Sequence, residues 1–249
     1  MSFFSFLIGF GASIALLRLA MVTDANQRTK WLLFGLLVLA GALFGARLAF
    51  AAAHSNFFST RAGEILNFAA GGLWWPGALA GGMLIALGIG LARPHSLGMT
   101  LDKFSVMFLP MAIAFWLASW SAGVAYGARL DPSVWWGFPM LDISGVIAQR
   151  VPVQPAAALT LLLLLGGIEL AWRKPAAPGR RMGVLLLVLS IHTLLFSFMR
   201  TDPIQPWLRL RLDVWAAILF LTIAILLLVA TFVVQSKKAT IAVNEDDIL

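Results

Sequence analysis

Cysteine is absent from the sequence, so the chain has no disulfide, no thiolate nucleophile and no cysteine-ligated metal. Charge is scarce as well, since 12% of the residues are Asp, Glu, Lys or Arg, against about 25% in an average soluble protein. Hydrophobic residues make up 61% of the chain, and apolar runs long enough to cross a bilayer recur along it. Together these features predict an all-α, polytopic integral membrane protein.

Several motifs that carry chemistry in other proteins are missing too. The sequence has no glycine-rich phosphate loop, no serine–histidine–acid set and no cluster with metal-ligand spacing. His54 and His95 fall in different loops, which we expect on opposite faces of the membrane. We therefore expect no metal and no cofactor, with a bound phospholipid as the one exception. The net charge of +7 fits basic cytoplasmic loops that face anionic lipid, rather than a nucleic-acid partner.

Seven apolar segments are predicted to span the membrane. They cover residues 3–22, 31–53, 66–92, 105–127, 155–172, 182–199 and 213–235. The first segment carries its single charge, Arg18, near its end and lacks the features of a cleaved signal peptide, so we expect it to be retained. The sequence thus predicts one seven-helix membrane domain over residues 1–236, followed by a mobile, acidic cytoplasmic tail over residues 237–249.

Lys and Arg are unevenly shared between the two sets of loops. The loops after the first, third and fifth spans, with the tail, hold ten of them, and the opposite set holds six. The positive-inside rule then places the N-terminus outside and the C-terminus in the cytoplasm.

The third apolar segment, from Leu66 to Ala92, contains no charged residue and is rich in glycine. Glycines allow another helix or a lipid to approach the backbone closely. Pro76 lacks an N–H group, so we expect it to break or kink the helix near mid-membrane. Backbone groups freed at that depth are tolerated only inside protein or beside a cavity. This segment is therefore predicted to line a site, with tight helix packing as the alternative explanation.

A series of short motifs runs along the chain in a fixed order. They are Gly45-Ala46-Arg47-Leu48, the stretch from Gly71 to Gly82, Tyr126-Gly127, Trp136-Gly137-Phe138-Pro139, Pro152-Val153-Gln154 and Phe198-Met199-Arg200-Thr201-Asp202. In this order and over nearly the whole chain they resemble the motifs of the bacterial prolipoprotein diacylglyceryl transferase family. That resemblance implies seven spans, an outside N-terminus and a place in the bacterial inner membrane. Members transfer a diacylglyceryl group from phosphatidylglycerol to the thiol of a lipobox cysteine.

The same alignment shows polar residues of the family replaced in this chain. Pro76 stands where the family has a histidine, Trp116 where it has an arginine, and Val151 where it has a second histidine. Further replacements are Ala122, Ala156, Ala157, Thr193 and Ser197. Transfer to a thiol requires a base, because a free thiol has a pKa of about 8.5, and it requires cations around the phosphate. The resemblance thus implies a degenerate member with no catalytic residues.

Residues that survive at motif positions form the predicted lipid-binding set: Arg47, Gly71, Gly72, Gly77, Gly81, Tyr126, Gln154 and Arg200. We expect the two arginines to hold an anionic lipid phosphate at the outer rim, with acyl chains along the glycines. The alternative for Arg47 is an ion pair with Glu64 or Asp142. His192, alone in mid-span, is expected to be a hydrogen-bonded structural residue, and Glu169 is expected to pair with Arg173.

Two function classes remain. The first is a catalytically lapsed relative that acts as a lipid-holding or scaffolding subunit of a membrane complex, with phospholipid and other membrane subunits as partners. The second is an active diacylglyceryl transferase with a rearranged site that uses His192, His54 or Arg200. We favour the first, because almost every group that could bind phosphate or move a proton is replaced.

Overall fold

The computed structural model describes residues 3–68, 71–93, 97–172, 177–203, 206–207 and 210–246. The long helices are α1 (Phe3–Met21), α2 (Arg28–Ala53), α4 (Trp75–Leu91), α6 (Phe108–Ser121), α7 (Val153–Ala171), α8 (Arg180–Met199) and α9 (Leu212–Asp246). Shorter helical pieces are η1 (Ala25–Gln27), α3 (Ser55–Phe58), η2 (Ala62–Leu66), α5 (Leu97–Phe104) and η5 (Ser105–Met107). Two small antiparallel pairs join β1 (Phe138–Leu141) to β2 (Ile147–Arg150), and β3 (Pro206–Trp207) to β4 (Leu210–Arg211).

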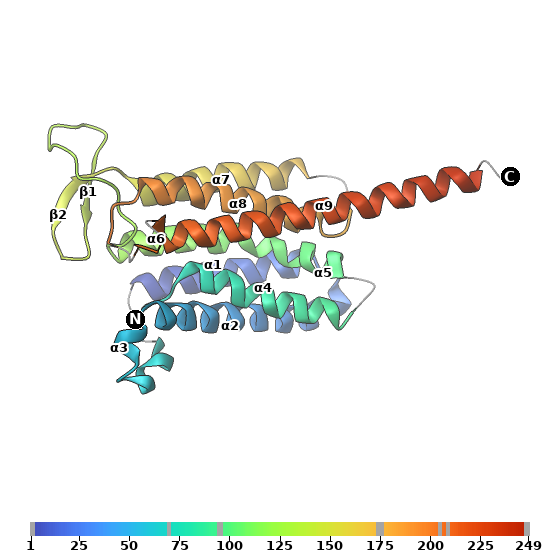
Figure 1. The fold of residues 1–249 in the computed structure, drawn as a ribbon, viewed down its shortest axis with the longest axis horizontal. Coiled ribbons are helices and arrows are strands. Elements are labelled where there is room, and N and C mark those ends of the chain that lie inside the picture. Colours follow the sequence, from blue (N-terminus) through green and yellow to red (C-terminus); the bar gives the residue numbers. More distant parts are fainter. Residues whose placement is uncertain are drawn as a thin grey trace.

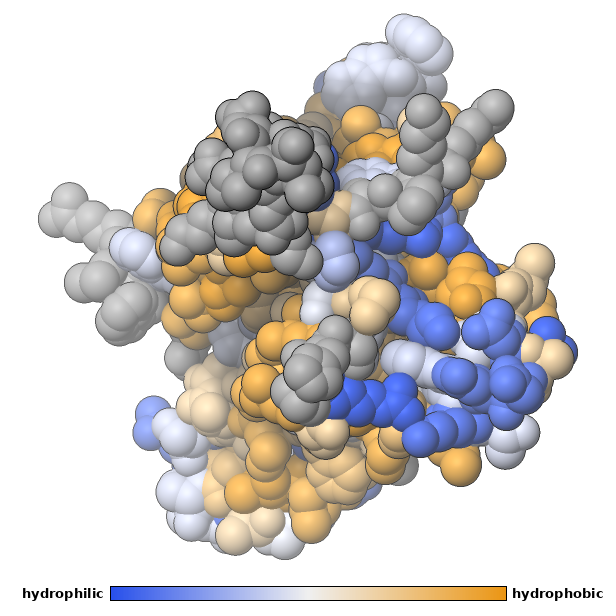
Figure 2. Space-filling view, turned by 90° about the vertical axis from the view of Figure 1, so that its right-hand side faces the viewer, coloured by the Kyte–Doolittle hydropathy of each residue, from blue (hydrophilic) through white to orange (hydrophobic). Residues whose placement is uncertain are grey.

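The long helices run side by side as one elongated bundle (Figure 1). The β1–β2 hairpin and α3 lie at one end of it, which we call the hairpin end, together with the N-terminal end of α1. Helix α9 extends beyond the opposite end, which we call the tail end. Figure 2 looks at the tail end and shows hydrophilic residues gathered on one side of it, beside hydrophobic surface.

Among the described residues, six helices are long and apolar enough to cross a membrane, counting α5 to α6 as one. The apolar α4 has 17 residues and runs beside α2. This confirms the polytopic helical fold, while the total of seven spans and the orientation stay predictions. Five of the expected spans match helices within a few residues at their starts: α1, α2, α7, α8 and α9.

The predicted third span was wrong in its first part. Residues 62–66 form η2, residues 71–74 are not helical, and α4 begins only at Trp75. Pro76 therefore does not kink a helix at mid-membrane but occupies the first turn of α4. Proline is well tolerated there, because the first N–H groups of a helix have no partner within the helix.

The fourth span also begins earlier than expected. The predicted loop from Arg93 to Phe104 contains α5, which continues through η5 into α6, and the helix ends at Ser121 rather than Gly127. Leu101 and Phe104 lie on the buried side of α5 and pack into the core around Trp31. The spacing of these apolar residues is that of an amphipathic helix. Because polar residues lie between them, the segment lacks a continuous apolar run and was predicted as a loop.

Two further segments contain structure that the sequence did not predict. The long loop from residue 128 to 154 contains the β1–β2 hairpin, whose register pairs Phe138 with Arg150. The backbone of α9 continues to Asp246, past the predicted start of the tail at residue 237, while the single membrane domain and the mobile tail stay predictions. Residues 247–249 lie outside the described part of the chain.

Glycines hold α2 and α4 together. A Cβ atom on Gly77 would collide with the backbone carbonyl of Gly45, and one on Gly81 would collide with that of Gly41. The two helices thus meet backbone to backbone through a pair of small-residue stripes, which is a common way for helices to associate in membranes. This packing fixes α4 along α2 and sets the position of the loop that precedes it.

Candidate functional site

An apolar cavity of about 470 Å³ lies in the middle of the bundle. Residues of α1, α2, α4, α6 and α8 line it, including Trp74, Trp75 and Trp116. Among the described residues that line it, Thr193 and Arg200 alone carry a hydroxyl or charged group, and nearly all the other side chains are hydrocarbon. A space with these walls suits an acyl chain better than a polar reactant.

Arg200, the polar group at this cavity, is fully paired. Its guanidinium donates to both carboxylate oxygens of Asp202, at 3.0 and 2.8 Å, and to Oδ2 of Asp213 at 2.8 Å. Arg211 joins the same cluster through Asp202 at 3.1 Å, and the indole N–H of Trp74 donates to Asp213 at 2.8 Å. Two arginines and two aspartates cancel, so the cluster presents no net charge to the cavity.

The pKa of Asp202 reflects this pairing. Burial alone raises the pKa of a carboxyl group, but the hydrogen bonds and positive charges of Arg200 and Arg211 outweigh burial and hold the pKa of Asp202 below its usual value. Asp202 therefore stays ionised at neutral pH and keeps its ion pairs with Arg200 and Arg211. The expectation that Arg200 offers a free cation to a lipid phosphate finds no support in this geometry.

Arg47 is 3% exposed and lies against the loop before α4. Its Nε donates to the carbonyl of Ile65 at 2.8 Å and its Nη2 to the carbonyl of Glu64 at 2.7 Å, while Nη1 donates to the carbonyls of Gly71 and Gly72. Both glycines have positive φ, at +76° and +70°, a conformation that turns the loop backbone and that side chains disfavour. Neither ion pair expected for Arg47 forms, since it meets only the backbone of Glu64 and Asp142 pairs with Arg150.

Gly77 and Gly81 face α2, as described above, so helix α2 itself occupies the groove expected to hold acyl chains. Tyr126 is buried under the guanidinium of Arg150, 4.4 Å from the ring centre. Gln154 is fully buried and donates from Nε2 to the carbonyl of Val124 at 2.8 Å. Neither Tyr126 nor Gln154 lines the apolar cavity.

His192 is buried on α8, as expected for a structural histidine. Its Nε2 lies 2.8 Å from the hydroxyl of Thr160, and its ring packs on Phe196 and Trp116. Its Nδ1 has no hydrogen-bond partner. Glu169 pairs with Arg18 and, at 3.8 Å, with Arg181. Arg173, the partner expected for it, lies outside the described residues, so that pairing stays a prediction.

The structure thus separates the predicted lipid-binding set into different places. Arg47, Gly71 and Gly72 form one contact group, Arg200 belongs to the ion cluster, and the other members are packed elsewhere. The sequence analysis did not assign Asp213 and Arg211 to the site. The one feature that could have pointed to them is that two charged residues stand at the start of the last apolar span. Within the described residues no group of His, Asp and Glu side chains could hold a metal ion.

The family model described as "Prolipoprotein diacylglyceryl transferase" matches residues 2–230, which is nearly the entire chain. The chain belongs to this family. A search of curated proteins gives no significant match. The family consists of bacterial inner-membrane enzymes, so this relative is a multi-pass protein of the bacterial inner membrane, in agreement with its apolar helices. It is a diacylglyceryl transferase-like protein by membership.

Proposed function

We propose that this transferase-like protein has lost catalysis and holds lipid in its apolar cavity as a non-catalytic subunit of a membrane complex. The observation that carries the proposal is the cavity itself, where the one cation among the described lining residues, Arg200, is paired with Asp202 and Asp213. A lipid phosphate gains little from a cation whose charge is already neutralised by two carboxylates at 2.8 Å. Acyl chains gain van der Waals contacts from packing against the hydrocarbon walls.

Positions that carry polar groups in the family support the same proposal. Trp116 is 4% exposed and Thr193 is 7% exposed, and both line the cavity. Ser197 is 1% exposed, and its hydroxyl has no partner. None of the three can supply the cation or the strong base that thiol acylation needs.

The alternative is an active transferase with a rearranged site. His192 is the best candidate base for it, because its Nδ1 has no hydrogen-bond partner among the described residues. That nitrogen is buried, the ring packs on Trp116 and Phe196, and His192 does not line the cavity. A general base must come within hydrogen-bond reach of the proton that it removes. The buried position therefore favours the non-catalytic function.

Filling the cavity tests the proposal. Ala112 lines the cavity, so Ala112→Phe should lower the amount of tightly bound lipid per protein several-fold. Lipid is extracted from the purified full-length protein and quantified by mass spectrometry. Ala52→Phe, which adds the same volume at an exposed position of α2, is the control and should retain wild-type lipid. Equal lipid content in Ala112→Phe and the wild type would count against the proposal.

A further inference from the structure

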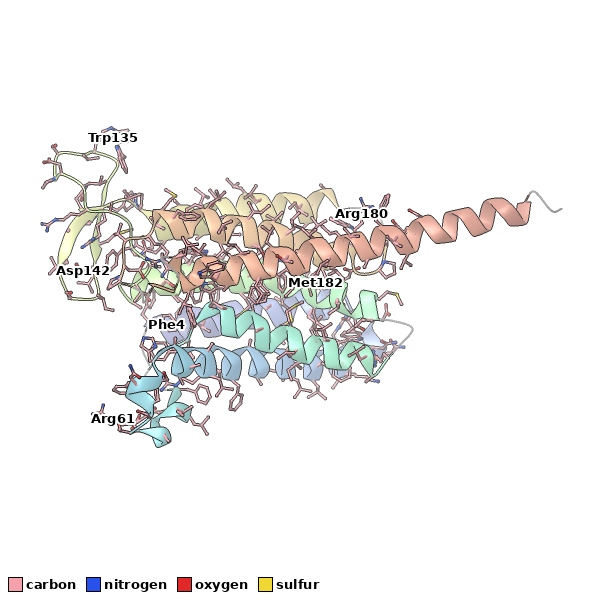
Figure 3. The ribbon with its side chains drawn as sticks, viewed as in Figure 1. Phe4, Arg61, Trp135, Asp142, Arg180 and Met182 are labelled. Carbon is pink, nitrogen blue, oxygen red and sulfur yellow. The ribbon has the colours of Figure 1, made fainter. Side chains whose placement is uncertain are left out.

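A second cavity, of about 600 Å³, lies at the hairpin end between the last turns of α2, the short helix α3 and η2. Arg47 and Arg61 contribute to its walls, together with Phe57, Phe58 and Glu64. Figure 3 shows Arg61 on the segment that projects from the bundle, at the same end as Asp142 and opposite Arg180. This cavity shares no lining residue with the apolar cavity.

Arg47 is buried there without a counter-charge. None of the ion pairs among the described residues includes Arg47 or Arg61. Carbonyl oxygens satisfy four N–H groups of Arg47, and the rings of Phe58 and Phe50 lie 5.3 and 5.7 Å from its guanidinium carbon. Dipoles and rings stabilise a cation but do not neutralise it, and a buried unpaired charge is costly. An anion in the cavity would complete the site.

The net charge of the side chains around the cavity indicates the charge of the anion that would neutralise them. Arg47 and Arg61 contribute two positive charges, and the carboxylate of Glu64, which accepts from Asn67 at 2.8 Å, removes one. The remainder is a single positive charge when His54 is neutral. A group with one negative charge, such as a phosphate diester, matches it, and arginine binds phosphate oxygens well.

The apolar surroundings indicate where that phosphate comes from. Phe57 is 50% exposed and Leu66 is 61% exposed on the projecting segment, at one end of the apolar helices, where we expect the membrane surface. We propose that this cavity binds the phosphate of an anionic phospholipid head group between Arg47 and Arg61. Phe57, over which Arg61 lies at 4.7 Å, provides an apolar surface for the adjoining glycerol and chains. The site goes beyond the proposed function, because it neither includes the apolar cavity nor depends on lost catalysis.

Charge-changing variants of the full-length protein test the site. We use phosphatidylserine, which carries one net negative charge and is not the donor lipid of the family, and phosphatidylcholine as the neutral comparison. Arg61→Gln should weaken phosphatidylserine binding about five-fold, and Glu64→Gln should strengthen it by a similar factor, as expected for single charges near a surface. Arg129→Gln changes an exposed arginine outside the cavity and should have no effect. Arg47 is left intact because it holds the loop.

Binding is measured by native mass spectrometry of protein freed of endogenous lipid. Opposite effects of Arg61→Gln and Glu64→Gln, with no response to phosphatidylcholine, support the proposal, because a purely structural disturbance would not strengthen binding. Equal binding by all variants, or equal binding of both lipids, overturns it. Inorganic phosphate is added as a competitor, and displacement of phosphatidylserine at millimolar phosphate overturns the assignment to a lipid. Ala112→Phe should leave this binding unchanged, which separates it from the apolar cavity.

Discussion

Two arginines at matched motif positions differ in what surrounds their charge. Arg200 is paired with two aspartates, whereas Arg47 meets backbone carbonyls and aromatic rings. The first arrangement is neutral and joins the end of α8 to the start of α9. The second leaves a net charge beside an open cavity. Arg200 therefore has a structural role, whereas Arg47 is the arginine that we propose binds an anion.

The ion cluster should contribute strongly to stability. Asp213 is 0% exposed and contacts Arg200, Arg211 and Trp74. Asp213→Ala leaves a buried arginine without one of its partners, so the free energy of unfolding should fall by about 3 kcal/mol or more. Thermal unfolding followed by tryptophan fluorescence measures this.

Asp131→Ala is the control, because Asp131 is exposed and its carboxylate accepts hydrogen bonds from the neighbouring Ser133. It should unfold within about 0.5 kcal/mol of the wild type. If Asp213→Ala is as stable as this control, the cluster does not hold α4, α8 and α9 together.

At the scale of single residues, the sequence indicated which arginines to consider, but it did not predict the groups that they contact. The motif from Phe198 to Asp202 drew attention to Arg200. Its partner on α9, Asp213, follows a segment of the chain with no apolar pattern, so the sequence did not predict that the two would meet. The partners of Arg47 were not predictable from side chains, because they are carbonyl oxygens that every residue has. The two successive glycines before Trp74 were the one available signal for the turned backbone.

At the scale of elements, the α2–α4 pair depends on glycine. Gly77→Ala should destabilise the protein, because the added methyl group meets the carbonyl of Gly45 and the side chain of Ala49 on α2. Gly88→Ala, on the same helix with nothing within 4 Å of the added atom, should be neutral or stabilising, since alanine favours helix by about 1 kcal/mol over glycine. Melting temperatures of the two variants in detergent compare them directly. Equal losses would mean that backbone contact between α2 and α4 does not matter.

Long apolar runs predicted most helices well, because hydropathy over a span is a strong signal. The same signal misplaced the start of α4, since residues 66–74 are uncharged and mostly apolar and run directly into the helix that follows. Apolar composition does not separate a membrane helix from an apolar loop held by Arg47. For the glycine-rich stretch, the sequence analysis gave tight helix packing as the alternative to lining a site. The structure confirms that alternative for Gly77 and Gly81, which pack on α2.

At the scale of the whole molecule, orientation is the first prediction. The excess of Lys and Arg on one set of loops predicts that the hairpin end faces outward and the tail end faces the cytoplasm. Because the chain has no cysteine, single cysteines at Asn26, Arg61 and Ala177 can be labelled without background. In intact cells an impermeant reagent should label only the cysteine at position 61. Labelling at position 177 but not at position 61 would reverse the orientation.

Family membership and the apolar walls of the cavity lead to opposite expectations about activity. Membership alone suggests transfer of a diacylglyceryl group, whereas a cavity without a free cation or an accessible base suggests none. Loss of one general base costs about 10²–10⁴-fold in rate, and several losses together leave little. We therefore base our expectation about activity on the residues that line the cavity and not on family membership.

The most direct test is a transfer assay on the purified full-length protein with phosphatidylglycerol and a lipobox peptide. We predict no diacylglyceryl peptide above a no-protein control when the product is measured by mass spectrometry. Retained lipid in the same preparation would show that the protein is folded. Turnover well above the control that is abolished by His192→Ala or Arg47→Ala, in variants that unfold like the wild type, would contradict the account and establish an active transferase.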